Sequence, residues 1–440
     1  MSAKEDSAQA NAAATSASSS TARSAIQILS GQSKRKGLLS RLMPFFGPAF
    51  IASVAYIDPG NFAANIQSGA RFGYLLLWVV VASNLMAILI QLLAAKLGIA
   101  TGRNLAEQCR CDYPRPVVYF LWVLMEIVAM ATDLAEFLGA ALGFHLLLGV
   151  PLTIGGLLTA VVTFLILGLE RYGFRPLEIV ITGFVAVVAL SYLIEIFLAS
   201  TDWAQVGRSL VSPSFAGPES LVLASGILGA TVMPHAIFLH SALTQNRIVV
   251  REPAQLRLLF RYQILDVVVA MGAAGLINAA MLIMAASTFF GQGLTSVGSI
   301  EEAYRTLEPL LGKAASWVFG ISLLASGLSS SSVGTMAGQV IMQGFIRRHI
   351  PPWLRRVVTI APSLLVIFLG FDPTRTLVLS QVLLSFGLPF AIIPLVIFTS
   401  RRDIMGVLVN RRLTTAAAAL AAGLIVLLNL FLLYENLWGG

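Results

Sequence analysis

Long runs of apolar residues recur along this 440-residue chain and limit the folds that it can adopt. A helix needs about 20 such residues to cross a bilayer. Hydrophobic residues make up 57% of the chain and charged residues only 11%, which lies outside the usual range for soluble domains. The sequence therefore predicts an all-α, polytopic membrane protein with eleven transmembrane segments: 43–69, 73–100, 116–146, 151–169, 176–199, 220–245, 262–287, 314–345, 353–370, 376–399 and 413–434.

The connectors predict the orientation, because cytosolic loops of membrane proteins are enriched in lysine and arginine. With the amino terminus in the cytosol and the carboxyl terminus outside, the outer connectors receive only Arg71, Arg208, Arg305, Lys313 and Arg375. The cytosolic side receives Arg103, Arg110, Arg115, Arg171, Arg175, Arg247, Arg251, Arg257, Arg347, Arg348, Arg355, Arg356, Arg401, Arg402, Arg411 and Arg412. We interpret the net charge of +8 as this topology signal, so the expected partner surface is the lipid bilayer and not nucleic acid.

The chain is expected to divide into five parts. Residues 1–42 are rich in Ser and Ala and lack the apolar core of a signal peptide, so they are expected to form a disordered cytosolic tail. Residues 43–200 and 220–400 form two five-helix units joined by an extracellular connector at 201–219, and residues 401–440 hold a cytosolic loop and helix 11. Cys109 and Cys111 lie in one connector that is expected to face the cytosol, so they are expected to be reduced thiols. A metal site at Cys-Arg-Cys is the alternative, but two ligands do not complete a tetrahedral site.

Two of the apolar segments contain a proline beside residues that can bind metals. In the first segment the motif is Asp58-Pro59-Gly60-Asn61, where Pro59 lacks an amide hydrogen and Gly60 weakens the helix. In the sixth it is Ala230-Thr231-Val232-Met233-Pro234-His235. The two segments are five apart, and an odd number of helices per unit inverts the second unit. This spacing predicts two inverted five-helix repeats whose broken helices meet at a binding site in the middle of the membrane.

The residues at these breaks offer a mixed set of ligands. Asp58 supplies a carboxylate, Asn61 an amide oxygen and Met233 a thioether, and the breaks leave backbone carbonyls near Ala230 and Tyr56 unpaired. Oxygen ligands alone suit Mg²⁺ and Ca²⁺, whereas a thioether adds a preference for softer transition ions. We therefore expect a divalent transition metal ion as a transported substrate, with no cofactor. The alternatives are a structural cap for Asp58 and a gap-filling role for Met233.

The third segment carries three acids, Glu126, Asp133 and Glu136, on one helix face that covers about 15 Å. Each charge at this depth costs roughly 2.5 to 3.5 kcal/mol on insertion scales. We expect the three to carry protons; the alternative is a structural polar network. His235 is expected to relay protons, because histidine titrates near neutral pH, and His240 to make a polar contact.

Other chemistries are less well supported by the sequence. His235 and His240 do not form the His-Glu-x-x-His motif of membrane metalloproteases. The run Ser326-Gly327-Leu328-Ser329-Ser330-Ser331-Ser332 is more typical of close helix contacts than of a nucleophilic serine. Neither pattern indicates an enzyme.

The two broken motifs together resemble the paired signature of the Nramp family of proton-coupled divalent metal transporters, and within it the bacterial manganese importers. The resemblance extends over residues 43–434 and includes Thr132-Asp133-Leu134-Ala135-Glu136. It implies the fold of the amino-acid and sodium symporter superfamily, a location in the bacterial inner membrane, and import of Mn²⁺, Fe²⁺, Cd²⁺ or Co²⁺ with protons by alternating access. The alternatives are an amino-acid symporter of the same fold and a passive cation channel.

The resemblance also implies roles for individual residues. The implied metal ligands are Asp58, Asn61, Met233 and the carbonyls of Ala230 and Tyr56, joined by Gln381 in some states. The implied proton pathway consists of Asp58, Asp133, Glu136, Glu126 and His235. Magnesium-transporting relatives lack the methionine, so Met233 argues against that branch.

Overall fold

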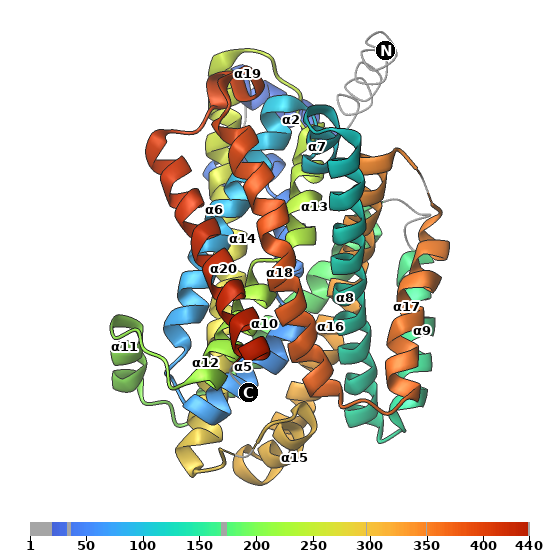
Figure 1. Ribbon diagram of the computed structural model, residues 1–440, viewed down its shortest axis with the longest axis vertical. Helices are drawn as coiled ribbons and strands as arrows, with labels where there is room; N and C mark the ends of the chain where they lie inside the picture. Colours follow the sequence, from blue (N-terminus) through green and yellow to red (C-terminus); the bar gives the residue numbers. More distant parts are fainter. Residues whose placement is uncertain (1–19, 33–36, 169–173, 296, 349, 439–440) are drawn as a thin grey trace.

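The computed structural model describes residues 20–32, 37–168, 174–295, 297–348 and 350–438. This part of the chain consists of helices and the loops that join them, without strands. The long helices run side by side along the long axis of the molecule (Figure 1). The all-α class predicted from the apolar segments is therefore confirmed.

Each of the eleven predicted segments coincides with a helix or with a broken helix. The unbroken ones are α6 (Leu77–Thr101), α8 (Arg115–Leu148), α9 (Leu152–Gly168), α10 (Phe174–Leu198), α14 (Pro253–Thr288), α16 (Lys313–Ile346), α17 (Pro352–Phe368), α18 (Pro373–Ser400) and α20 (Arg412–Trp438). Within the described chain, eight spans are long and apolar enough to cross a membrane, and α9 is a shorter apolar helix. The first segment is split, and α17 has only 17 residues. The count of eleven crossings stays a prediction.

The two broken helices form as the prolines predict. The first consists of α4 (Pro48–Val54) and α5 (Pro59–Phe72), and the second of α12 (Pro218–Thr231) and α13 (Pro234–Gln245). Each second half begins with its proline, where a helix needs no amide hydrogen. α5 packs against α14 and α12 against α18, which places both breaks inside the bundle (Figure 1).

Short elements gather at the two ends of the bundle. α2 (Ser20–Leu29), α7 (Leu105–Asp112) and α19 (Arg402–Met405) lie at the upper end in Figure 1, and α11 (Trp203–Val211) and α15 (Ile300–Leu311) at the lower end. At the upper end, Arg401 pairs with Asp112 at 2.7 Å and with Asp403 at 2.5 Å, and its hydrogen bond lowers the pKa of the Asp403 carboxyl. The remaining short turns are α3 (Leu38–Leu42), η1 (Met43–Phe45), η3 (Phe290–Gln292) and η4 (Gly406–Leu408).

The expectation of a disordered tail over residues 1–42 is wrong for residues 20–29, which form α2. Residues 1–19 and 33–36 lie outside the described residues, but α2 is a helix whose buried face repeats every three to four positions. Ala25, Ile28 and Leu29 on that face pack into a small apolar cluster with Ile248 and Leu259. A composition rich in Ser and Ala suggests disorder, but alanine is a strong helix former and its small side chain can pack on the apolar face.

Candidate functional site

The first break is held open by Asp58. This residue caps the amino terminus of α5, because its Oδ1 accepts hydrogen bonds from the backbone N–H of Asn61 at 2.9 Å and from the Asn61 side-chain amide at 2.7 Å. Asp58 and Asn61 are both fully buried. The structural cap considered above is therefore real, and it keeps the second carboxylate oxygen free for another partner.

Asn61 also connects the two breaks. Its Nδ2 donates to the backbone oxygen of Ala230, at the end of α12, at 3.0 Å. Gln381 of α18 donates from Nε2 to Asp58 Oδ2 at 3.3 Å. Four of the six predicted metal ligands, namely Asp58, Asn61, Ala230 and Gln381, thus lie in one hydrogen-bonded group.

Two glycines allow α18 to approach this group. A Cβ atom added at Gly60 would lie 1.8 Å from Gln381 Nε2, and one added at Gly229 would lie 2.0 Å from the Gln381 backbone oxygen. Both distances are far below van der Waals contact. Glycine is therefore required on α5 and on α12 for Gln381 to reach the site.

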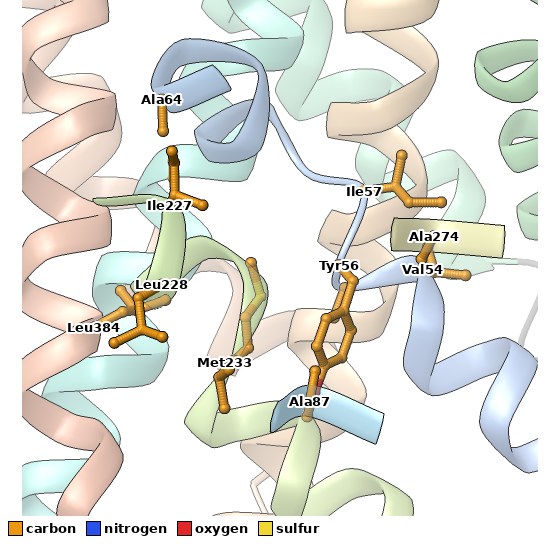
Figure 2. Close-up of a cluster of buried hydrophobic side chains, with 14 of the residues drawn as sticks. Val54, Tyr56, Ile57, Ala64, Ala87, Ile227, Leu228, Met233, Ala274 and Leu384 are labelled. Atoms are coloured by element: carbon orange, nitrogen blue, oxygen red, sulfur yellow. The ribbon is translucent and has the colours of Figure 1, made fainter. Parts of the chain in front are cut away.

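Tyr56 and Met233 occupy the two breaks themselves (Figure 2). Both are fully buried, and the Tyr56 hydroxyl accepts a hydrogen bond from Gln91 of α6 at 2.6 Å. The same hydroxyl lies within hydrogen-bonding reach of the Met233 backbone. This contact brings the two residues close to each other, but through the Tyr56 hydroxyl and the Met233 backbone and not through the predicted donors, the Tyr56 carbonyl and the Met233 sulfur.

The carbonyls expected to be unpaired at the breaks are in fact paired. The Tyr56 oxygen accepts a hydrogen bond from Asn278 of α14 at 2.9 Å, as the Ala230 oxygen does from Asn61. The next carbonyl, that of Ile57, accepts from the Ser326 hydroxyl at 2.8 Å. A carbonyl oxygen has two lone pairs, so each keeps one for a further partner.

The arrangement has the donor chemistry of a cation site. Asn61 Oδ1 and Gln381 Oε1 are buried and have no hydrogen-bond partner among the described residues, a costly state for amide oxygens. Rotating either amide by half a turn exchanges its nitrogen and oxygen, which would present oxygen toward Asp58. The described residues contain no cluster of three His, Cys, Asp or Glu side chains, so any ligand set here must include amide, carbonyl or thioether groups.

Two of the three acids of α8 form ion pairs with arginines of one other helix, α17. Asp133 pairs with Arg356 of α17 at 2.9 Å, and Glu126 pairs with Arg355 at 2.7 Å. Arg356 is 1% exposed and Asp133 3% exposed, so this ion pair is shielded from solvent. Glu126 also accepts from the Trp122 indole at 3.2 Å.

Glu136 differs from the other two acids. It is fully buried, and neither carboxylate oxygen has a hydrogen-bond partner among the described residues. A Cβ atom added at Gly334 of α16 would lie 2.6 Å from Glu136 Oε2 and 3.0 Å from Asp133 Oδ1. Glu136 is close enough to Asp133 and Asp58 for their charges to interact, so it lies between the break and the Asp133 ion pair.

The two histidines have separate surroundings. His235 Nδ1 lies 3.2 Å from the Thr132 hydroxyl of α8, next to Asp133 in sequence. His240 Nδ1 lies 2.8 Å from Gln91 Oε1, and Gln91 in turn bonds to Tyr56. The polar contact predicted for His240 is confirmed, and it reaches the first break through Gln91.

Several functional candidates were missed in the sequence. Arg355 and Arg356 were assigned to a cytosolic connector, but they are buried in the first turns of α17. Three acids in one apolar segment are a signal that compensating cations exist elsewhere. Glu195 and Asp266 were also overlooked, although an acid inside an apolar segment is itself a signal. Asp266 is buried and accepts from the backbone N–H groups of Gly47 and Ala49, at the start of α4.

Known proteins resemble this chain in sequence and in fold. Residues 49–435 match the family described as natural resistance-associated macrophage protein-like, or Nramp. The chain is 56% identical over 399 residues to the divalent metal cation transporter MntH of Deinococcus radiodurans, with 91% of each protein covered. It superposes on the manganese transporter of Eremococcus coleocola with a TM-score of 0.81 at 34% identity, covering 90% of this chain and 88% of that one.

A more distant structure shares the fold alone. The nucleobase–cation symporter Mhp1 matches with a TM-score of 0.55 at 16% identity, covering 88% of this chain and 90% of that one. This likeness confirms the predicted symporter-type fold. The family match spans both broken helices, the acids of α8 and the arginines of α17. The chain belongs to the Nramp family.

Proposed function

We propose that this protein is a secondary transporter that imports divalent transition metal ions together with protons. Mn²⁺ is the expected physiological substrate, and Fe²⁺, Co²⁺ and Cd²⁺ are further substrates. The relatives named as divalent metal cation and manganese transporters support this proposal. The observation that carries it is the Asn61 amide, which contacts Asp58 on one broken helix and Ala230 on the other. One side chain thus spans the donors of both breaks.

The donors around Asn61 explain the preference for a transition metal. Asp58 provides a negative charge, and the amides of Asn61 and Gln381 provide oxygen once they rotate. The Met233 thioether is the one soft donor at the breaks, and soft donors favour transition ions over Mg²⁺ and Ca²⁺. Selectivity is therefore assigned to Met233 and binding strength to Asp58.

The burial of the site supports transport by alternating access. Asp58, Asn61 and Met233 are all fully buried, so the site is closed toward both ends of the bundle in this conformation. α8 and α16 pack extensively on each other and form a scaffold. Movement of the half-helices against this scaffold would open one side at a time. A passive channel needs a continuous path instead.

An amino-acid substrate fits the site less well. It would need partners for both an ammonium and a carboxylate group. No described lysine or arginine forms an ion pair or a hydrogen bond with Asp58. The carboxylate of an amino acid would therefore lack a basic partner at this site.

The proton route is assigned to the acids of α8. Glu136 interacts with the charges of both Asp58 and Asp133, so a proton released from Asp58 when metal binds can pass to this group. Asp133 and Glu126 continue the route along α8, and His235 borders it through Thr132. The route leads toward the end of the bundle that holds α2 and α7, which the arginine distribution assigns to the cytosol of a bacterial cell.

The test uses purified protein in proteoliposomes with simultaneous readouts of metal and of internal pH. The panel contains Mn²⁺, Fe²⁺, Co²⁺, Cd²⁺, Mg²⁺ and Ca²⁺, with a mixture of amino acids as an alternative substrate. We expect saturable Mn²⁺ uptake with internal acidification, and little uptake of Mg²⁺ or Ca²⁺. Non-saturable cation flux would indicate a channel, and amino-acid uptake without metal uptake would indicate a symporter; either result would contradict the proposal.

A further inference from the structure

Glu195 on α10 is a buried acid that the route along α8 does not use. Among the described side chains of α10, from residue 179 on, it lies on the buried face with Ile181, Val188 and Tyr192, whereas the other faces are largely exposed. Glu195 itself is 0% exposed. Neither carboxylate oxygen has a hydrogen-bond partner among the described residues, and no ion pair within them includes it.

The neighbours of Glu195 connect it to the moving half-helix. Tyr192, one turn earlier on α10, interacts with the Glu195 charge, and its ring packs edge-on against Phe62 of α5 at 5.4 Å between centroids. Ser322 of α16 lies at the Tyr192 hydroxyl, in a geometry that falls short of a full hydrogen bond. Phe62 also packs against Phe319 of α16 at 6.1 Å. Tyr192, one turn from Glu195, thus lies where α10, α16 and α5 meet.

The helices packed on α10 bring no counter-charge to Glu195. α4 contains no charged residue, and Asp266 of α14 is already bonded to the start of α4. The two arginines of α14, Arg257 and Arg261, are exposed and lie in the first turns of that helix, before Asp266. Lys313 of α16 is exposed and lies more than two helical turns before Ser322. An ionised carboxylate without a partner is too costly in such a place. Glu195 therefore holds a proton in this conformation.

One face of α16 leads from the Tyr192 hydroxyl, next to Glu195 on α10, to the acids of α8. Ser322, Ser326 and Ser330 are fully buried and spaced four residues apart, so they share a face. Ser326 bonds to the first break through the Ile57 oxygen, and Gly334, one turn beyond Ser330, lies at Glu136 and Asp133. The three hydroxyl groups cover about 12 Å along the helix, and the distance from Ser322 to Gly334 is about 18 Å.

We propose that Glu195 is a second proton-binding site, which exchanges protons with Glu136 along the hydroxyl face of α16 during metal transport. A proton from the side that holds α11 and α15 binds the Glu195 carboxylate. The proton then leaves Glu195 toward Glu136 through serine hydroxyls and intervening water, each of which accepts one proton and donates another. The next external proton then restores the neutral acid. This inference rests on the proposed proton-coupled function.

The test compares the proton flux of two substitutions. If Glu195 binds a proton, Glu195→Gln should lose more of this flux than Glu195→Asp; if Glu195 only packs, Glu195→Asp should be the more defective variant. Glu195→Gln keeps the shape and neutrality of the protonated acid but cannot release a proton. Glu195→Asp shortens the side chain but keeps a carboxyl group. In proteoliposomes we expect Glu195→Gln to retain Mn²⁺ uptake and to lose part of the accompanying proton flux, while Glu195→Asp retains more of that flux. Glu308→Gln, which neutralises an exposed acid on α15, is the control and should match the wild type.

Three outcomes of this experiment would contradict a proposal. Wild-type proton flux per Mn²⁺ in Glu195→Gln would overturn the role of Glu195. A defect confined to Glu195→Asp would overturn it as well, because that result would indicate that the side chain serves only in packing. An absence of Mn²⁺-dependent proton flux in the wild type would instead contradict the proposed function itself. Should Glu195→Gln fail to fold, infrared difference spectra of the wild type and of Glu195→Asp test the proposal instead. The carbonyl band of a protonated acid must change on Mn²⁺ addition in the wild type and shift in Glu195→Asp; identical spectra would overturn the proposal.

Discussion

Replacing Arg356 by methionine should destabilise the protein strongly, because it leaves Asp133 as a buried charge without a partner. Arg356 donates to Asp133 at 2.9 Å, to Thr335 at 3.3 Å and to the Ser331 hydroxyl. Thr335 keeps a hydrogen bond to the Ser331 backbone at 3.0 Å after the change. The main loss therefore falls on Asp133, which is 3% exposed.

The expected magnitude follows from this burial. Breaking a buried ion pair by removing one partner costs about 3–5 kcal/mol. Removing both charges, as Asp133→Asn with Arg356→Met, leaves only unmade hydrogen bonds, which cost about 1–3 kcal/mol. We therefore expect the double variant to be more stable than Arg356→Met alone, with a coupling free energy of about 2 kcal/mol between the two sites.

The measurement is reversible unfolding in mixed detergent micelles, followed by tryptophan fluorescence. Arg355→Met is a matched comparison, because its partner Glu126 is 17% exposed and better screened, so its cost should be smaller. Arg401→Met, at an exposed ion pair, should leave stability almost unchanged. The reasoning would be refuted if Arg356→Met cost no more than Arg355→Met, or if the double variant showed the sum of the single losses.

Four further predictions concern transport. Asp58→Ala should abolish saturable Mn²⁺ uptake, and retained uptake would contradict the site assignment. Met233→Ala should keep part of the Mn²⁺ uptake while Ca²⁺ or Mg²⁺ compete better, so unchanged competition would remove the role of the thioether. Asp133→Asn should reduce the proton flux that accompanies Mn²⁺, and wild-type coupling would place the proton route elsewhere. Gly60→Ala adds a methyl group 1.8 Å from the amide nitrogen of the α18 glutamine and should raise the KM for Mn²⁺; Gly207→Ala, with nothing within 4 Å, is its control.

The broken helices could be predicted from the sequence because their causes are local. A proline inside an apolar run removes a hydrogen bond wherever the run folds. Asp58 and Met233 border those prolines, so their place at the breaks followed directly. The pairing of Tyr56 with Asn278 did not, because these residues are more than 200 positions apart and no local rule joins them.

Arg355 and Arg356 show a limit of counting charges in connectors. Such counting treats an arginine near the end of an apolar segment as exposed to the cytosol. Here the first turns of α17 lie against α8, so both guanidinium groups turn inward to the acids. A long arginine side chain can serve either role, and only the packing of α17 decides between them.

Under the proposed function, the Asn61 side chain would couple the two broken helices through two positions of its amide. With its nitrogen toward Ala230 it ties the end of α12 to the start of α5, and its oxygen is left without a partner. A cation that binds the amide oxygen requires the amide to rotate, and this rotation breaks the hydrogen bond from Asn61 to the Ala230 oxygen. Binding of the cation and separation of α5 from α12 would then both result from one rotation of the Asn61 amide.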